Sequence, residues 1–140
     1  MARKFTLREA ESLLPRLTEL LREAVALKAG YQAAERRFAS LTSRIAMLGG
    51  ANLDQERAAD ARRERDGAAE RLNHAVAAIH ETGCVVKDLD IGLLDFPALF
   101  RGREVYLCWK LGEPAIRFWH GIDEGFAGRK PIGAEFLESS

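Results

Sequence analysis

The chain has 140 residues, of which 47% are hydrophobic and 30% charged, and its 21 basic and 21 acidic residues give a net charge of zero. This composition predicts one folded domain with its own core rather than a disordered segment. Because phosphate binding needs a basic surplus, the balanced charge argues against nucleic acid as the main partner. No segment approaches the roughly 20 apolar residues of a membrane span, so we expect no membrane contact.

The first residues contain no apolar run of the kind that signal peptides have, and we therefore expect a cytoplasmic protein. Cys84 and Cys108 both lie in apolar, strand-like segments. In a reducing compartment such cysteines are usually buried free thiols, so a disulfide is not expected.

Residues 1–83 are predicted to form a helical hairpin. Thr6 with Glu9 three positions later is typical of a capping box at a helix start. Pro15 then predicts either a kink or a second helix that begins with proline in its first turn.

From Leu13 onward, apolar residues follow alternating steps of four and three, which is a heptad pattern. The seam consists of Leu13, Leu17, Leu20, Ala24, Leu27, Tyr31, Ala34, Phe38, Leu41, Ile45 and Leu48. Gly49 and Gly50 predict the end of this helix. A second helix is expected over about 54–82, and its mostly small seam residues would permit close packing, with Arg65 stacked on Phe38.

A lone two-helix hairpin of this length leaves much of its apolar stripe in water. We therefore expect a homodimer in which two hairpins form a four-helix bundle. Leu17, Leu20 and Leu27 are predicted to bury themselves partly against the second chain.

Residues 84–140 are predicted to form a small antiparallel β module packed on the base of the hairpin, so that the chain is one structural unit overall. The predicted fold class is α+β, with a long antiparallel, coiled-coil-like helical hairpin followed by a small antiparallel β-sheet. Strands are expected over 84–87, 104–110 and 115–120. If Lys110 pairs with Ala115, one face is core, with Val105, Leu107, Trp109, Ile116, Phe118 and His120. The other face would hold Tyr106, Cys108, Lys110, Arg117 and Trp119.

Four stretches resemble the signature blocks of a bacterial family known as domain of unknown function 2203: FTLREAESLLPRL, GCVVKDLDIGLLDFP, GREVYLCWKLGEPAIRFWH and GFAGRKPI. The resemblance covers nearly the whole chain, and the C-terminal blocks are specific. It implies a helical hairpin followed by a sheet in a bacterial intracellular protein. It implies no activity, cofactor or catalytic residue.

Asp88, Asp90 and Asp95 lie among apolar residues and therefore need partners. Asp88 and Asp90 resemble the start of a calcium loop, but Gly92 and Leu99 stand where that loop needs an oxygen ligand and a glutamate. Paired carboxylates also perform acid–base chemistry when one pKa is raised. We expect instead that Asp88 and Asp95 are held by arginine or backbone donors and not by a metal.

The histidines give no metal-binding spacing. A zinc set of His80, Glu81 and His120 would form only if the helix end met the sheet. We therefore expect no metal ligands and no cofactor.

The leading functional hypothesis is a non-enzymatic, self-associating interaction or ligand-binding protein. The alternative is a small enzyme that acts on an anionic or phosphorylated substrate through the β module. Aromatic rings beside cations suit an anionic, planar ligand. The candidate ligand-binding residues are Lys87, Asp88, Asp90, Asp95, Arg103, Tyr106, Lys110, Arg117, Trp119, His120 and Arg129.

Overall fold

A computed structural model describes residues 3–50 and 52–139 of the protein, without the side chains of 137–139. It has two compact units, Met1–Arg22 with Val76–Ser140 and Glu23–Ala75. We call the first the sheet unit and the second the hairpin unit. The two long helices contribute to both, so the units divide within these helices and not at their end. The expected α+β class is confirmed.

The helices of the sheet unit begin where the sequence predicts. Helix α1 (Leu7–Ser12) has the expected capping box, in which Thr6 Oγ1 accepts the Glu9 N–H at 3.1 Å and Glu9 Oε1 accepts the Thr6 N–H at 2.9 Å. Helix α2 (Leu14–Leu48) then begins separately, with Pro15 in its first turn. Of the two predicted alternatives, the restart is therefore correct.

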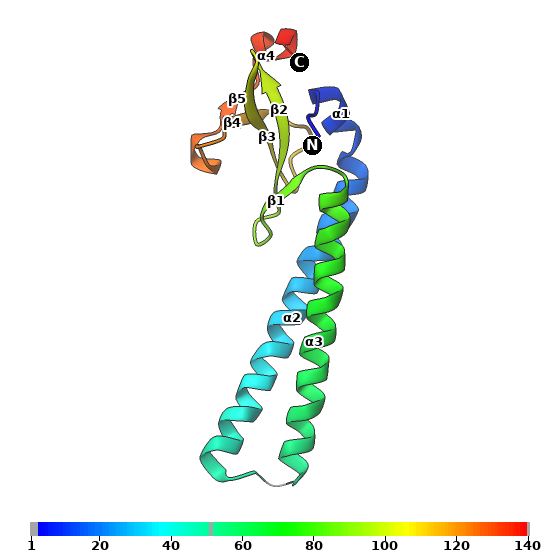
Figure 1. Ribbon diagram of the computed structural model, residues 1–140, viewed down its shortest axis with the longest axis vertical. Coiled ribbons are helices and arrows are strands. Elements are labelled where there is room, and N and C mark those ends of the chain that lie inside the picture. Colours follow the sequence, from blue (N-terminus) through cyan, green and yellow to red (C-terminus); the bar gives the residue numbers. More distant parts are fainter. Residues whose placement is uncertain (1–2, 51, 140) are drawn as a thin grey trace. The chain divides into compact units, whose positions relative to one another are not determined.

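Five antiparallel strands follow in the order β1-β2-β3-β4-β5 (Figure 1). They are β1 (Val85–Asp88), β2 (Leu93–Phe100), β3 (Arg103–Lys110), β4 (Phe118–Gly121) and β5 (Lys130–Pro131). β2 and β3 are joined through Arg101 and Gly102, whose φ angles of 52° and 78° match a two-residue type I′ turn. After β4 come a short 3₁₀ turn, η1 (Phe126–Gly128), and helix α4 (Ala134–Ser139).

The predicted pairing of Lys110 with Ala115 is wrong by one residue. Residues 111–117 form an irregular loop, and β4 pairs Leu107 with Trp119 and Tyr106 with His120. A slip of one residue moves every side chain of a strand to the other face. Trp119 therefore lies on the face of Leu107, whereas Phe118 and His120 lie on the face of Tyr106, Cys108 and Lys110.

The two faces of the sheet differ in composition. The helix face carries Leu94, Phe96, Ala98, Val105, Leu107, Trp109 and Trp119. Phe5 packs edge-on against Phe96 there, with ring centroids 5.4 Å apart, and Leu17, Leu21 and Ile79 of the same unit are fully buried. The polar face carries Asp95, Pro97, Tyr106, Cys108, Phe118 and His120.

The hairpin unit, Glu23–Ala75, contains the C-terminal part of α2 and most of α3 (Asn52–Glu81), and these two helical segments run side by side (Figure 1). Its buried residues are alanines: Ala24, Ala34, Ala58, Ala61, Ala68 and Ala75. The Arg65 guanidinium lies 4.6 Å from the Phe38 ring centroid, which confirms the predicted stack. Gly49, at a φ of 70°, follows the end of α2 as expected. Over the described residues, no helix is both long enough and apolar enough to cross a membrane.

Candidate functional site

Asp95, Cys108 and His120 form a buried polar cluster on the polar face. Asp95 and Cys108 are cross-strand partners on β2 and β3, and His120 on β4 pairs with Tyr106, the neighbour of Cys108 on the same face. Asp95 and His120 are each only 1% exposed, and Cys108 is fully buried. The ligating atoms of the three side chains lie within 4.8 Å of one another, so the cluster could hold a metal ion.

Hydrogen bonds determine the role of one nitrogen of the His120 ring. Its Nδ1 lies 2.8 Å from the carbonyl oxygen of Gly121, which only accepts, so Nδ1 carries a hydrogen. Its Nε2 lies 3.0 Å from Asp95 Oδ1. A hydrogen bond between these two atoms needs a proton on one of them, so the pair shares a proton or binds a cation in its place.

Burial sets the acidity of the cluster. Removal from water raises the pKa of Asp95, and the hydrogen bond to His120 with the charges of His120 and Lys87 only partly opposes this. Burial likewise raises the pKa of the Cys108 thiol, against the lowering effect of Arg129. Both groups are therefore held toward their neutral forms unless a cation lies beside them.

Arg129 covers the cluster from the chain segment after β4. Its guanidinium donates to both carboxylate oxygens of Glu113, at 3.2 and 3.1 Å, and lies 3.9 Å from the Phe118 ring centroid and 4.3 Å from that of Phe126. Its Nη1 is 3.9 Å from Cys108 Sγ. This arrangement closes the polar face over Cys108.

A separate hollow of about 700 Å³ lies at the edge of the helix face and is called here the Trp119 hollow. Its volume falls within the usual range for small-molecule sites. It is lined by Phe100, Arg101, Arg103, Glu104, Val105, Trp119, Gly121, Ile122, Asp123, Glu124 and Lys130.

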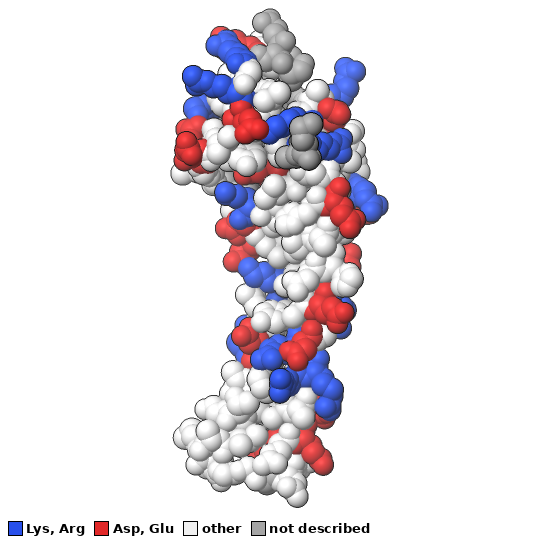
Figure 2. All heavy atoms as spheres, in the orientation of Figure 1, with Lys and Arg blue, Asp and Glu red and all other residues white. Residues whose placement is uncertain are grey.

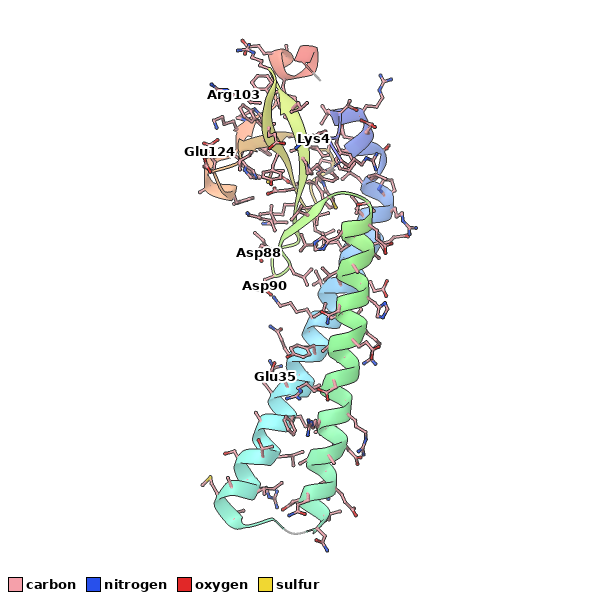
Figure 3. The ribbon with its side chains drawn as sticks, viewed as in Figure 1. Lys4, Glu35, Asp88, Asp90, Arg103 and Glu124 are labelled. Atoms are coloured by element: carbon pink, nitrogen blue, oxygen red, sulfur yellow. The ribbon has the colours of Figure 1, made fainter. Side chains whose placement is uncertain are left out.

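Most charges of the Trp119 hollow are already paired. Glu104 binds Lys4 at 2.6 Å, Arg101 binds Glu135 at 3.0 Å, and Lys130 forms an ion pair with Glu124. The side chain of Arg103, by contrast, forms no hydrogen bond or ion pair with the residues that the structure describes. Figure 3 labels Arg103 and Glu124 in this part of the sheet unit.

The candidate residues fall into separate groups. Asp95, Tyr106, His120 and Arg129 lie at or beside the buried cluster, whereas Arg103 and Trp119 line the Trp119 hollow. The prediction that Trp119 shares a face with Tyr106 and Lys110 is wrong, because of the register. Arg117 is exposed in the loop before β4, and Lys87 is exposed on β1.

Asp88 is the last residue of β1, and Asp90 lies in the turn between β1 and β2 (Figure 3). Asp88 Oδ1 accepts the Asp90 N–H at 2.9 Å, which confirms the predicted backbone donor for Asp88. For Asp95 that prediction is wrong, because its partner is His120. The zinc set of His80, Glu81 and His120 does not form: within residues 3–50 and 52–139, the potential metal ligands that group together are those of the buried cluster.

Sequence reasoning did not identify four residues as members of a site: Cys108, Glu113, Glu124 and Lys130. The alternation of Tyr106, Cys108 and Lys110 along one strand was visible in the sequence, but whether His120 shares the face of Cys108 depends on the register of β4. Glu113, Glu124 and Lys130 form ion pairs that involve loop residues, and the sequence carries no periodic pattern for such contacts.

The family model described as "Uncharacterized conserved protein (DUF2203)" matches residues 3–132. No curated protein and no solved structure matches the chain.

Proposed function

This chain belongs to the DUF2203 family, and on that premise we propose that it is a non-enzymatic binding protein that holds a small anionic ligand in the Trp119 hollow. The observation that carries the proposal is Arg103, whose guanidinium forms no ion pair with the described residues and lines a hollow of suitable size. Its guanidinium offers a forked pair of donors that fits a carboxylate or a phosphate.

The apolar lining supports a ligand with a hydrophobic or planar part. Phe100, Val105, Trp119 and Ile122 supply that surface beside Arg103. Phe100 lies 5.0 Å from Trp119 between ring centroids, and both rings pack on Phe136, which is 1% exposed. This packing fixes the aromatic wall before a ligand arrives, which reduces the entropy cost of binding.

The alternative, a small enzyme, has less support. Its acid or base would have to face the substrate, yet Asp95 and His120 are each 1% exposed. In the Trp119 hollow, hydrogen bonds from Lys130 and from the Gly121 N–H lower the pKa of Glu124 and keep its carboxylate ionised. A carboxylate held in this way is an acceptor of hydrogen bonds and a poor proton donor.

We expect Arg103→Ala to weaken binding of phenyl phosphate and benzoate at least tenfold, or about 1.4 kcal/mol. The measurement is isothermal titration calorimetry on the full chain, with benzamide as a neutral probe. Arg117→Ala is the matched control, because Arg117 is exposed in the same unit but does not line the hollow. Equal binding of charged and neutral probes, or equal losses in both variants, would contradict the proposal.

The proposal also includes self-association through the hairpin. Met47, Leu48 and Leu53 at the hairpin end are 80%, 72% and 56% exposed, which is unusual for side chains of this size. In Figure 2 this end, at the bottom of the view, is mostly uncharged on the visible face, with acidic groups at its right edge. Leu20 and Leu27 are only half-buried in one chain, whereas Leu17 is fully buried within it.

We expect sedimentation to report a dimer at micromolar concentration. The double variant Leu48→Ser with Leu53→Ser should raise the dissociation constant of the dimer at least tenfold. Ile122→Ser is the control, because Ile122 is 51% exposed but lies in the sheet unit. A wild-type monomer at these concentrations would rule out the dimer.

We place this protein in a bacterial cytoplasm. The compartment is supported chemically, because Cys84 and Cys108 are both free and buried, as expected of thiols in a reducing compartment. The bacterial origin rests on the family resemblance.

A further inference from the structure

We propose that Asp95, Cys108 and His120 bind one Zn²⁺ ion between the strands β2, β3 and β4. The proposal concerns the polar face and does not depend on ligand binding in the Trp119 hollow. It rests on the geometry, orientation and charge of the three side chains.

The spacing of the cluster is close to that of a metal site. Bonds of about 2.0–2.3 Å from zinc to nitrogen, oxygen and sulfur place neighbouring ligand atoms of a tetrahedron roughly 3.3–3.7 Å apart. The three ligand atoms of the cluster lie within 4.8 Å of one another, and Nε2 and Oδ1 are 3.0 Å apart. Small side-chain rotations therefore suffice to centre an ion.

The orientation of His120 is the one that metal-binding histidines adopt. Such histidines donate their second ring N–H to a carbonyl or carboxylate, which fixes the tautomer and directs the free lone pair at the metal. His120 Nδ1 donates to the Gly121 carbonyl at 2.8 Å, and Nε2 is thereby directed at Asp95 and the centre of the cluster.

The charges of the cluster favour a divalent cation. A carboxylate and a thiolate together carry two negative charges, which one Zn²⁺ ion neutralises in a site removed from water. Two such anions buried side by side without a cation would be strongly unfavourable. Arg129 is the positive group nearest to Cys108 in the segment that covers the cluster, and its bidentate pair with Glu113 offsets its repulsion of the ion.

The types of ligand select the metal. Thiolate and imidazole favour zinc over magnesium and calcium, which prefer oxygen ligands alone. Three protein ligands leave one position of the tetrahedron for a further group. The competing interpretation is a hydrogen-bonded Asp95–His120 pair beside a neutral thiol, with no metal.

Cobalt and zinc titrations of the full chain, stripped of metal with a chelator, separate these interpretations. We expect one equivalent of Co²⁺ to give an absorption band from charge transfer between thiolate and metal. Added Zn²⁺ should displace the Co²⁺ and abolish this band. We also expect Zn²⁺ to bind with submicromolar affinity in competition with a chromophoric chelator. Failure of the wild-type protein to show the thiolate band, or zinc binding weaker than about 10 μM, would overturn the proposal.

The matched variants are Cys108→Ser and Cys84→Ser. Both cysteines are buried, at 0% and 2% exposure, but Cys84 lies outside the cluster. We expect Cys108→Ser to lose the thiolate band and to bind Zn²⁺ at least 100-fold more weakly, while Cys84→Ser keeps both properties. Unchanged zinc affinity in Cys108→Ser would overturn the assignment. If Cys108→Ser does not fold, a thiolate band in the wild-type protein that Cys84→Ser retains supports the site, and loss of the band in Cys84→Ser overturns it.

Discussion

Phe96→Ala is expected to lower the free energy of unfolding by about 3–5 kcal/mol, the usual cost of truncating a buried phenylalanine. Phe96 is fully buried at the centre of the helix face, and its ring meets the edge of Phe5. The truncation therefore removes contacts with both the neighbouring strands and the N-terminal segment. A loss of this size is a large part of the roughly 5–15 kcal/mol that stabilises a typical domain.

Urea denaturation followed by tryptophan fluorescence measures this loss, because Trp109 and Trp119, the two tryptophans of the chain, both lie in the sheet unit. Leu99→Ala on the same strand is the control, because Leu99 is 44% exposed and its truncation should cost less than about 1 kcal/mol. Similar losses in the two variants would show that the helix face is not the core of this unit.

Asp95→Ala is expected to cost about 1–3 kcal/mol in the presence of a chelator, because it leaves His120 Nε2 buried without a partner. Asp95→Asn should cost less, since an amide N–H can donate to a neutral Nε2. The chelator removes any metal contribution, so this result reports on the hydrogen bond alone. The measurement is again the urea midpoint and its slope.

Asp123→Ala controls for loss of a carboxylate from the same unit, because Asp123 is exposed. Its effect should stay within about 0.5 kcal/mol. A loss below 1 kcal/mol for Asp95→Ala would mean that the Asp95–His120 contact contributes little to the fold.

The helical part of the fold could be predicted because its causes are local. The capping box at Thr6, the restart at Pro15 and the end at Gly49 each depend on residues within one or two turns. The contact between Arg65 and Phe38 followed from heptad spacing alone. These features therefore needed no knowledge of distant parts of the chain.

Strand β2 could not be predicted in the same way, because it is buried on both faces. Its residues from Leu93 to Ala98 are all buried, so the alternation that identifies a half-exposed strand is missing. Pro97 also argues against a central strand. Pro97 is accommodated because the pairing of β2 with β1 reaches only as far as Asp95. The Pro97 carbonyl instead accepts the Phe5 N–H at 2.7 Å.

The candidate sites depend on the register of β4. A loop whose length differs by one residue decides whether His120 or Trp119 faces Cys108. The sequence showed the residue types of both sites, but their grouping requires pairing across strands that are distant along the chain. That is why the cluster of Asp95, Cys108 and His120 was found only in the structure.

The sheet unit is built from both ends of the chain, with residues 23–75 between its two parts. During synthesis on the ribosome, Phe5 and Leu17 therefore emerge long before Phe96, the strand residue that completes their core. Until then these apolar side chains remain exposed to water and to other chains. Early pairing of α2 with α3 would shorten the loop that must close, and so reduce its entropy cost. Pairing of the two helices would in this way lower the cost of closing the core of the sheet unit.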